Sequence, residues 1–218
     1  MPPYSLYYSL KPWIPWRFRH LLKSYRARWL LKSCGDVWPI KQSAGIKPDG
    51  WPGWPDGKQF SFVLTHDVES KVGLQSVREL AELEMSLGFR STFNFVPEGE
   101  YRVPPGLRQW LTENGFEVGI HGLHHDGKLY ASAELFTERA QRINRYLKEW
   151  NVEGFRSPFM HHNLRWLHLL NIAYDSSTFD TDPFEPQPDD VNTIFPYWVS
   201  LDGNGKYGYV ELPYTLVQ

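Results

Sequence analysis

The stretch FEVGIHGLHHD, residues 116–126, joins a strand-like run to three of the eight histidines of the chain. Its apolar first half predicts a strand that ends at His121. A second strand-like run, Phe60–Thr65, leads directly into His66, Asp67 and Glu69. Two histidines and a carboxylate at strand ends are the donors that a divalent transition metal with open coordination positions requires. The two stretches together predict a metal site, although any one of these histidines alone would suit a surface loop.

The spacing of the three histidines leaves two pairs open. His121 and His125 are four residues apart, so they would share one face if a helical turn began at His121. The competing pair is His121 with His124. We favour His125, because Asp126 directly after it could orient the imidazole ring from behind.

The carboxylate ligand has to come from the first of the two stretches. Asp67 and Glu69 lie on the same side of an extended segment, so one can bind metal while the other accepts a proton from the attacking water. His66 is interpreted either as a residue that contacts the metal ligands without binding the metal or as a further metal ligand. His168 falls within a helical pattern and is interpreted as structural.

Charge is distributed unevenly along the chain. Residues 1–35 contain seven Lys or Arg and no acidic residue, whereas residues 36–218 hold 16 basic and 25 acidic side chains. The excess of acidic residues in 36–218 argues against nucleic acid as a partner. No apolar run reaches the ~20 residues of a membrane span, and the N-terminus does not have the pattern of a signal peptide. The single cysteine, Cys34, provides no disulfide. These features predict a cytoplasmic protein.

The basic N-terminal part predicts a helix over residues 17–32. Its apolar stripe consists of Phe18, Leu21, Leu22, Tyr25 and Trp29. Basic side chains on the remaining surface are typical of a helix on an anionic membrane, and equally of a helix packed on the acidic body. A Pro-, Gly- and Trp-rich connector follows. We therefore assign residues 1–57 to this helix and connector, and residues 58–218 to the main domain.

Strand and helix patterns alternate through the main domain. The expected strands are Phe60–Thr65, Arg90–Val96, Phe116–His121, one that begins at Gly154, Ile172–Ser176, Ile194–Val199 and Tyr209–Leu212. The expected helices are Leu74–Leu87, Leu107–Glu113, Ala133–Trp150 and Leu164–Leu170. Repeated β–α units predict an α/β fold with a parallel sheet, either doubly wound or closed into a barrel, and with reactive residues after the strands.

Four motifs follow one another at the predicted strand ends. They are LTHDVE at 64–69, GIHGLHH at 119–125, GFRSP at 154–158 and YDSS at 174–177. In this order they resemble the motif series of the NodB-homology polysaccharide deacetylases, metal-dependent enzymes of the carbohydrate esterase type. The resemblance covers about residues 58–215. It implies a distorted (β/α)7 barrel and hydrolysis of a C–N amide bond, with removal of an acetyl group from an N-acetylated sugar.

The resemblance also implies one divalent metal ion. His121 and His125 match its two histidine ligands. Most members carry a metal-binding Asp directly after the catalytic base, where this chain has Val68. A subset has Asp-x-Asp instead, and Glu69 takes the place of its second carboxylate. Zinc is favoured as the metal, and cobalt, nickel, manganese and iron are alternatives.

Four further residues match catalytic positions of the family. Asp67 matches the base that activates water, and Arg156 matches the arginine that holds this base. Phe159 matches the position whose backbone N–H stabilises the oxyanion. Asp175 matches a carboxylate near the general-acid histidine.

That histidine belongs to a Leu-x-His motif on the last strand, which this sequence lacks up to Gln218. His161, His162 or the metal alone are the substitutes within the chain. A barrel would also want a further unit after the last predicted strand. We therefore expect a barrel that is incomplete at the C-terminus.

The leading interpretation is thus a metal-dependent deacetylase. Its substrate is left open between a glycan, a lipid-linked or nucleotide-linked sugar precursor, and a small cyclic or linear amide. Two other classes also stay open. One is a catalytically degenerate member that binds a glycan or a partner. The other is a non-haem iron enzyme, because two histidines and a carboxylate also bind Fe(II).

Overall fold

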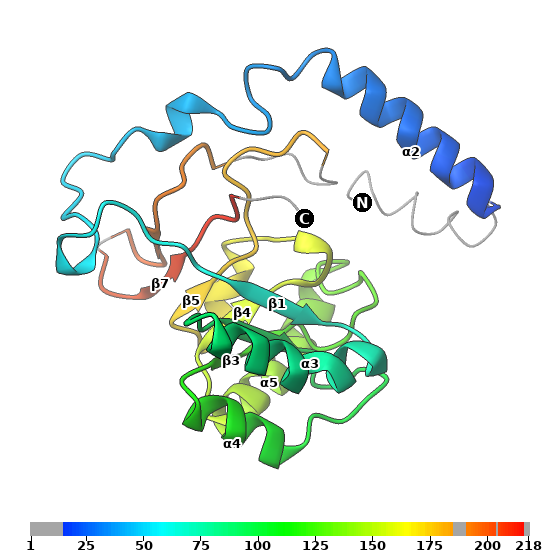
Figure 1. The fold of residues 1–218 in the computed structure, drawn as a ribbon, viewed down its shortest axis with the longest axis vertical. Coiled ribbons are helices and arrows are strands. Elements are labelled where there is room, and N and C mark those ends of the chain that lie inside the picture. Colours follow the sequence, from blue (N-terminus) through cyan, green and yellow to red (C-terminus); the bar gives the residue numbers. More distant parts are fainter. Residues whose placement is uncertain (1–14, 185–190, 204, 216–218) are drawn as a thin grey trace.

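The computed structural model describes residues 15–184, 191–203 and 205–215. One seven-stranded sheet organises this part of the chain, in the order β1-β2-β3-β4-β5-β7-β6 (Figure 1). Its strands are β1 (Thr65–Val68), β2 (Thr92–Phe95), β3 (Glu117–His121), β4 (Gly154–Arg156), β5 (Tyr174–Asp175), β6 (Tyr197–Ser200) and β7 (Gly208–Glu211). The α-helices are α2 (Trp16–Leu31), α3 (Lys71–Ser86), α4 (Pro105–Glu113) and α5 (Ala133–Trp150). Short 3-10 turns are η2 (Gln42–Gly45), η3 (Pro55–Gly57), η4 (Pro158–Met160) and η5 (Trp166–Leu169).

The sheet confirms the predicted α/β class. Strands β1 to β5 and β7 are parallel, and β6 pairs antiparallel with β7. The antiparallel pair at the end of the sheet follows from the short link at residues 201–207, which permits only a hairpin. Within the described residues, β1 and β6 are edge strands and no ladder joins them.

Two other boundaries differ from the sequence prediction. The first strand begins at Thr65, not at Phe60, and the exposed side chains of Phe60 and Phe62 precede it. The predicted helix Leu164–Leu170 is a single 3-10 turn, which Asn163 caps by accepting a hydrogen bond from Trp166 N at 3.1 Å. The start of the first strand follows from the pairing of Thr65 with Thr92 on β2 rather than from local apolar content.

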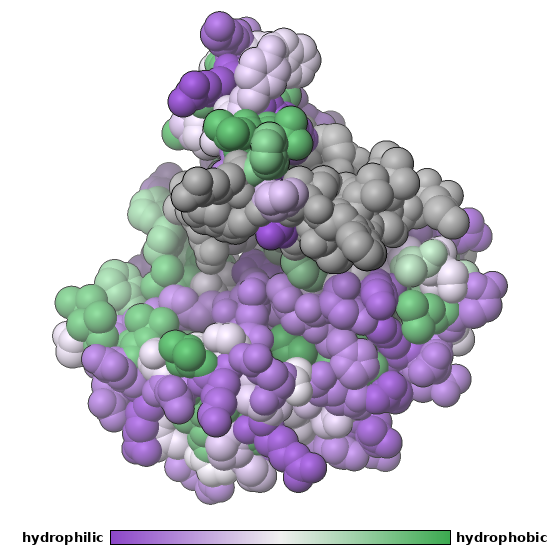
Figure 2. Space-filling model, turned by 90° about the vertical axis from the view of Figure 1, so that its right-hand side faces the viewer, coloured by the Kyte–Doolittle hydropathy of each residue, from purple (hydrophilic) through white to green (hydrophobic). Residues whose placement is uncertain are grey.

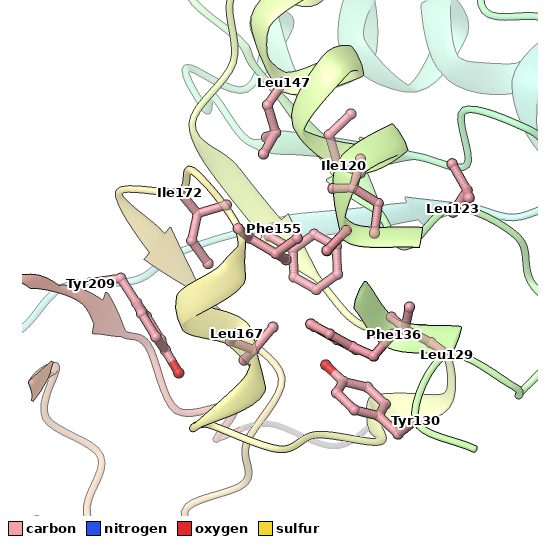
Figure 3. Packing of buried hydrophobic residues seen from close by; sticks show 13 residues of the cluster. Ile120, Leu123, Leu129, Tyr130, Phe136, Leu147, Phe155, Leu167, Ile172 and Tyr209 are labelled. Atoms are coloured by element: carbon pink, nitrogen blue, oxygen red, sulfur yellow. The ribbon is translucent and has the colours of Figure 1, made fainter. Parts of the chain in front are cut away.

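Two apolar clusters hold the helices against the sheet. One lies between β1–β3 and helices α3 and α4, and includes Phe93, Phe95 and Leu111. The other lies between β3, β4, β7 and α5 and includes Phe136 and Phe155 (Figure 3). Together they fix the strands whose carboxyl ends carry the candidate site.

Helix α5 shows why its sequence forms this element. Ser132 caps its N-terminus by accepting a hydrogen bond from Leu135 N at 3.2 Å, and Asn151 ends it in the left-handed conformation. Its buried side chains recur at helical spacing and form one stripe, which consists of Phe136, Arg139, Ala140, Ile143 and Leu147.

Helix α2 lies well apart from helices α3 to α5 (Figure 1). The apolar stripe of α2 is exposed, so the alternative in which this stripe packs on the acidic body is wrong. In the connector, Trp51 and Trp54 pack on Phe195 with ring centroids 5.0 and 6.0 Å away. None of the described helices combines the length and apolar content needed to cross a bilayer.

We expect Ile143→Ala to lower the free energy of unfolding by about 2–5 kcal/mol, because Ile143 is fully buried between α5 and the sheet. Chemical denaturation of the two proteins measures this difference. Gln141→Ala is the matched control on the exposed side of α5, with an expected change within about 0.5 kcal/mol. Equal losses for both variants would contradict the assigned core.

Candidate metal centre and active site

The register of the first three strands places a polar group beside Asp67. Asp67, Asn94 and Gly119 are partners across β1, β2 and β3. Asn94 Nδ2 donates a hydrogen bond to Asp67 Oδ1 at 3.0 Å. Gly119 makes this reach possible, because a Cβ there would lie 2.2 Å from Asn94 Oδ1. Our sequence reasoning missed Asn94, although an amide within the apolar run TFNF was a usable signal.

Arg156 approaches the same carboxylate from β4. Its buried guanidinium has Nη1 3.5 Å from Asp67 Oδ1, and Nη1 donates to Thr65 Oγ1 at 2.8 Å. Its Nε donates to the carbonyl oxygen of Ser176 at 3.0 Å. The structure thus brings Arg156 to Asp67, and the contacts of Asn94 and Arg156 both go to Oδ1. Oδ2 is left for a further partner.

Three further residues converge at the carboxyl ends of β1 and β3. One donor atom each from Glu69, His121 and His125 lies within 4.8 Å of the others. Glu69 Oε1 is 3.1 Å from His125 Nε2 and 3.7 Å from His121 Nε2. The nearby imidazoles of His121 and His125 lower the pKa of the Glu69 carboxyl far below its usual range. The group is therefore ready to act as an anionic donor at neutral pH.

This group fits a divalent metal ion on its own chemistry. His121 Nε2 and His125 Nε2 are buried, and within the described structure neither makes an aligned hydrogen bond, although both lie within ion-pair distance of Glu69 Oε1. Two orphaned imidazole nitrogens facing a carboxylate form an N,N,O donor set suited to zinc and related metals. Glu69 has a half-exposed side chain, so this side of the group faces solvent. They are the three residues that the resemblance implied as metal ligands, and the structure brings them together.

The backbone after β3, rather than a helical turn, brings the two histidines together. His121 ends β3, and Gly122 turns the chain with a φ of 62°. The carbonyl oxygen of Arg156 lies 3.1 Å from His121 Nδ1 and also accepts from Gly122 N at 3.1 Å. A proton on Nδ1 would make the opposite nitrogen, Nε2, the ligand atom. The expected helical turn at His121 is thus wrong.

The competing histidine points elsewhere. His124 Nδ1 is 2.8 Å from the carbonyl oxygen of Glu98, away from the three-residue group. The expected support of His125 by Asp126 is also wrong, because Asp126 forms a bidentate pair with Arg139 at 2.8 and 2.7 Å. Burial would raise the pKa of Asp126, but the hydrogen bonds from Arg139 and from Lys128 N outweigh it and lower this pKa. Asp126 therefore stabilises the loop and not the ring.

Phe159 lies on the turn η4, beside the histidines. Its φ of 59° and the φ of 54° at Met160 put two consecutive non-glycine residues in the left-handed region. Such strain concentrates at functional sites. The Phe159 ring packs 4.3 Å from the His125 ring, centroid to centroid. The turn therefore lies against the candidate metal ligands, as a backbone N–H for an oxyanion would need.

The remaining histidines do not join this group. His66 faces helix α3, where its Nε2 is 2.6 Å from Glu84 Oε1. His168 packs against the Tyr209 ring at 5.2 Å. Burial, with a contribution from the charge of His162, lowers the pKa of His161 to about 4. His161 is therefore neutral at pH 7, which disfavours it as a general acid.

Asp175 is fully buried and pairs with a carboxylate from β7. Its Oδ1 accepts from Ser177 Oγ at 2.6 Å, while Glu211 Oε1 accepts from Thr178 Oγ1 at 2.7 Å. Burial, and next the charge of Glu211, raise the pKa of Asp175 well above its usual range. The folded protein therefore favours a proton on Asp175, beside the Glu211 carboxyl. No sequence pattern pointed to Glu211, which reaches Asp175 through the pairing of β5 with β7.

This carboxyl pair supports the turn that carries Phe159. Ser177 Oγ accepts a hydrogen bond from Ser157 N at 2.8 Å, directly before η4. Ser157 Oγ is in turn 2.6 Å from Tyr130 Oη. Asp175 therefore lies behind the turn, in contact with Ser177 rather than with the histidine that the resemblance placed beside it.

Comparison with solved structures identifies the fold. A protein from Mycobacterium smegmatis, assigned as a polysaccharide deacetylase, matches with a TM-score of 0.55 and 20% identity, over 74% of this chain and 61% of that chain. An allantoinase matches with a TM-score of 0.46 and 19% identity, over 65% and 44% of the two chains. A family 4 carbohydrate esterase from Streptomyces lividans, in complex with acetate, matches with a TM-score of 0.43 and 15% identity, over 52% and 60%.

No protein-family model matches this sequence, and no curated protein matches it significantly. The likeness therefore shows the fold: this chain has the α/β fold of the polysaccharide deacetylases. The matched part spans less than two thirds of the Mycobacterium smegmatis protein.

We expect His121→Ala and His125→Ala each to weaken zinc binding by more than about 100-fold, because each removes a direct ligand and loss of an outer partner alone costs 10–100-fold. Titration calorimetry at pH 7 measures the affinity. His124→Ala is the matched control, since its ring faces Glu98. Loss of binding in His124→Ala with retention in His125→Ala would exchange the roles of these two residues.

The raised pKa of Asp175 predicts a pH dependence of stability. The folded chain retains a proton on Asp175 that the unfolded chain releases above pH ~4, so the free energy of unfolding falls as the pH rises through this window. Glu211→Gln removes one of the two carboxyl groups, and we expect a smaller loss between pH 5 and pH 8. Denaturation at both pH values measures it, with Glu138→Gln on the surface of α5 as control. Identical pH slopes in Glu211→Gln and the unchanged chain would show that Glu211 does not contribute to the raised pKa of Asp175.

Proposed function

We propose that this protein is a metal-dependent hydrolase of a C–N amide bond, and that it removes the acetyl group from an N-acetylated sugar of a glycan or a glycan precursor. The observation that carries the proposal is the convergence of Glu69, His121 and His125 at the sheet edge that also presents Asp67. The deacetylase fold supports it, since carbohydrate deacetylases use this scaffold.

A divalent metal held by Glu69, His121 and His125 would supply Lewis-acid polarisation of the amide carbonyl and acidify the attacking water. The chain itself provides the proton acceptor. Asp67 is held through Oδ1 by Asn94 and Arg156, which leaves Oδ2 to accept the proton of the water as it attacks the carbonyl carbon. This arrangement fixes the base without occupying both of its oxygens.

The oxyanion that forms from the carbonyl oxygen needs a hydrogen-bond donor. We assign this role to the backbone N–H of Phe159, whose strained turn rests on His125 and on the Ser157–Ser177 hydrogen bond. Such a preorganised N–H is worth about 3–4 kcal/mol of transition-state stabilisation in other acyl-transfer enzymes.

The leaving amine also needs a proton as the C–N bond breaks. Asp175 is fully buried and bonded to Ser177, and His161 is neutral at pH 7. Asp67 is therefore the residue we assign to both transfers. It takes the proton from water and then returns it to the amine nitrogen, so that acetate and the free amino sugar are released.

A second candidate function is glycan binding without turnover. It is favoured by the contacts of Asp175, which are to Ser177 and Glu211 and not to a histidine in the described part of the chain. The third class, a non-haem iron enzyme, is less well supported, because such sites usually lie in antiparallel barrels and this sheet is mainly parallel.

We expect Asp67→Asn to retain metal and to lower the rate of acetate release by at least 10²–10⁴-fold, the usual contribution of a positioned proton-transfer group. Release of acetate from N-acetylated oligosaccharides by the zinc- or cobalt-loaded protein measures it. Asp49→Asn, at an exposed position, is the matched control. If the unchanged chain binds the oligosaccharide but releases no acetate, the binding function replaces the hydrolase.

A further inference from the structure

Helix α2 presents an apolar stripe that no other element of the described residues covers. The exposed fractions of its side chains are 62% for Phe18, 66% for Leu21, 62% for Leu22, 75% for Tyr25 and 63% for Trp29. A helix of a globular domain normally turns such a stripe toward the core. The better-covered residues, Ala27 and Leu30, lie on the opposite face of the helix. The orientation of α2 therefore directs the stripe outward.

Basic side chains border this stripe. At 3.6 residues per turn the five apolar residues span about 100° of the helix surface. Arg28 lies along one margin of the stripe, and Arg19 and Arg26 lie along the other. No acidic residue occurs among residues 1–35. Figure 2 shows polar and apolar residues side by side on the uppermost part of the molecule, where α2 lies.

The segment after α2 is anchored near the sheet edge of the candidate site. The Val37 carbonyl oxygen accepts from Thr181 Oγ1 at 3.0 Å, and the Trp38 ring lies 5.0 Å from that of Phe184. Arg26 Nη1 itself donates to the Phe184 carbonyl oxygen at 3.3 Å. Residues 181–184 follow β5 on its carboxyl side, so α2 is held on the side of the sheet that carries the candidate metal ligands.

We propose that α2 docks flat on an anionic phospholipid surface, with its apolar stripe at the acyl boundary and the exposed Arg28 at the phosphate groups. A bilayer surface offers both chemistries that the helix presents, an apolar layer beneath a layer of negative charge. A second copy of this chain offers the negative charge, since residues 36–218 carry nine more acidic than basic side chains. A contact between copies is therefore the rival outcome. The docking does not depend on the proposed hydrolase activity.

The test is sedimentation of the full chain with vesicles of phosphatidylcholine alone, and of phosphatidylcholine with phosphatidylglycerol. We expect binding to the anionic vesicles to be at least ten-fold stronger, and to weaken several-fold as salt is raised. The double substitution Leu22→Glu/Tyr25→Glu alters exposed positions only and should lower binding by at least ten-fold. Arg28→Glu should lower it by several-fold. Val72→Glu, at a 72% exposed valine of α3, is the matched control and should bind like the unchanged chain.

Three results would overturn the proposal. The first is no binding of the unchanged chain to anionic vesicles. The second is equal binding by the unchanged chain and by Leu22→Glu/Tyr25→Glu. The third is self-association without vesicles, measured by light scattering, that the same double substitution abolishes, because the stripe would then be a contact between copies.

Discussion

The buried guanidinium of Arg156 is the interaction on which the arrangement of the site depends. Strand β1 is an edge strand that pairs only with β2, so the sheet alone does not connect it to β5 or β7. Arg156, which lies on β4, links β1 to the segment that follows β5. It donates to Thr65 on one side and to Ser176 on the other, and its guanidinium carbon lies 5.2 Å from the centre of the Tyr214 ring beyond β7. The position of Asp67 relative to the rest of the sheet follows from this bridge.

A buried charge of this kind needs compensation, because desolvation of a cation costs several kcal/mol. Asp67 supplies the negative partner, and a cavity of about 420 Å³ behind the guanidinium supplies room for water. Glu117, Tyr174 and Thr65 are among the polar residues of its lining. The rest of the lining is mostly apolar, so the hydrogen bonds that Arg156 donates to Thr65 and Ser176 supply the compensation beside Asp67.

Local sequence patterns predicted those elements whose stabilising interactions are themselves local in the sequence. Helix α5 has the predicted bounds, because its cap, its apolar spacing and its end all lie within residues 132–151. Much of the site was also visible, since parallel strands bring their carboxyl ends to one edge and the candidate ligands follow such strands. What was missed depends on register and on packing between distant segments. Asn94 meets Asp67 only through the pairing of β1 with β2, and Glu211 meets Asp175 only because β7 inserts beside β5.

The junction of Gly122 and Pro158 has a consequence for how this protein can vary. A Cβ at residue 122 would lie 2.5 Å from the Pro158 ring, and the left-handed backbone at Gly122 already disfavours any other residue. The loop that carries His125 and the turn that carries Phe159 therefore occupy one shared volume. A bulkier residue in one loop requires a retreat of the other, so the two segments can change only as a matched pair during evolution, and grafting either one alone into a related scaffold would displace both functional groups.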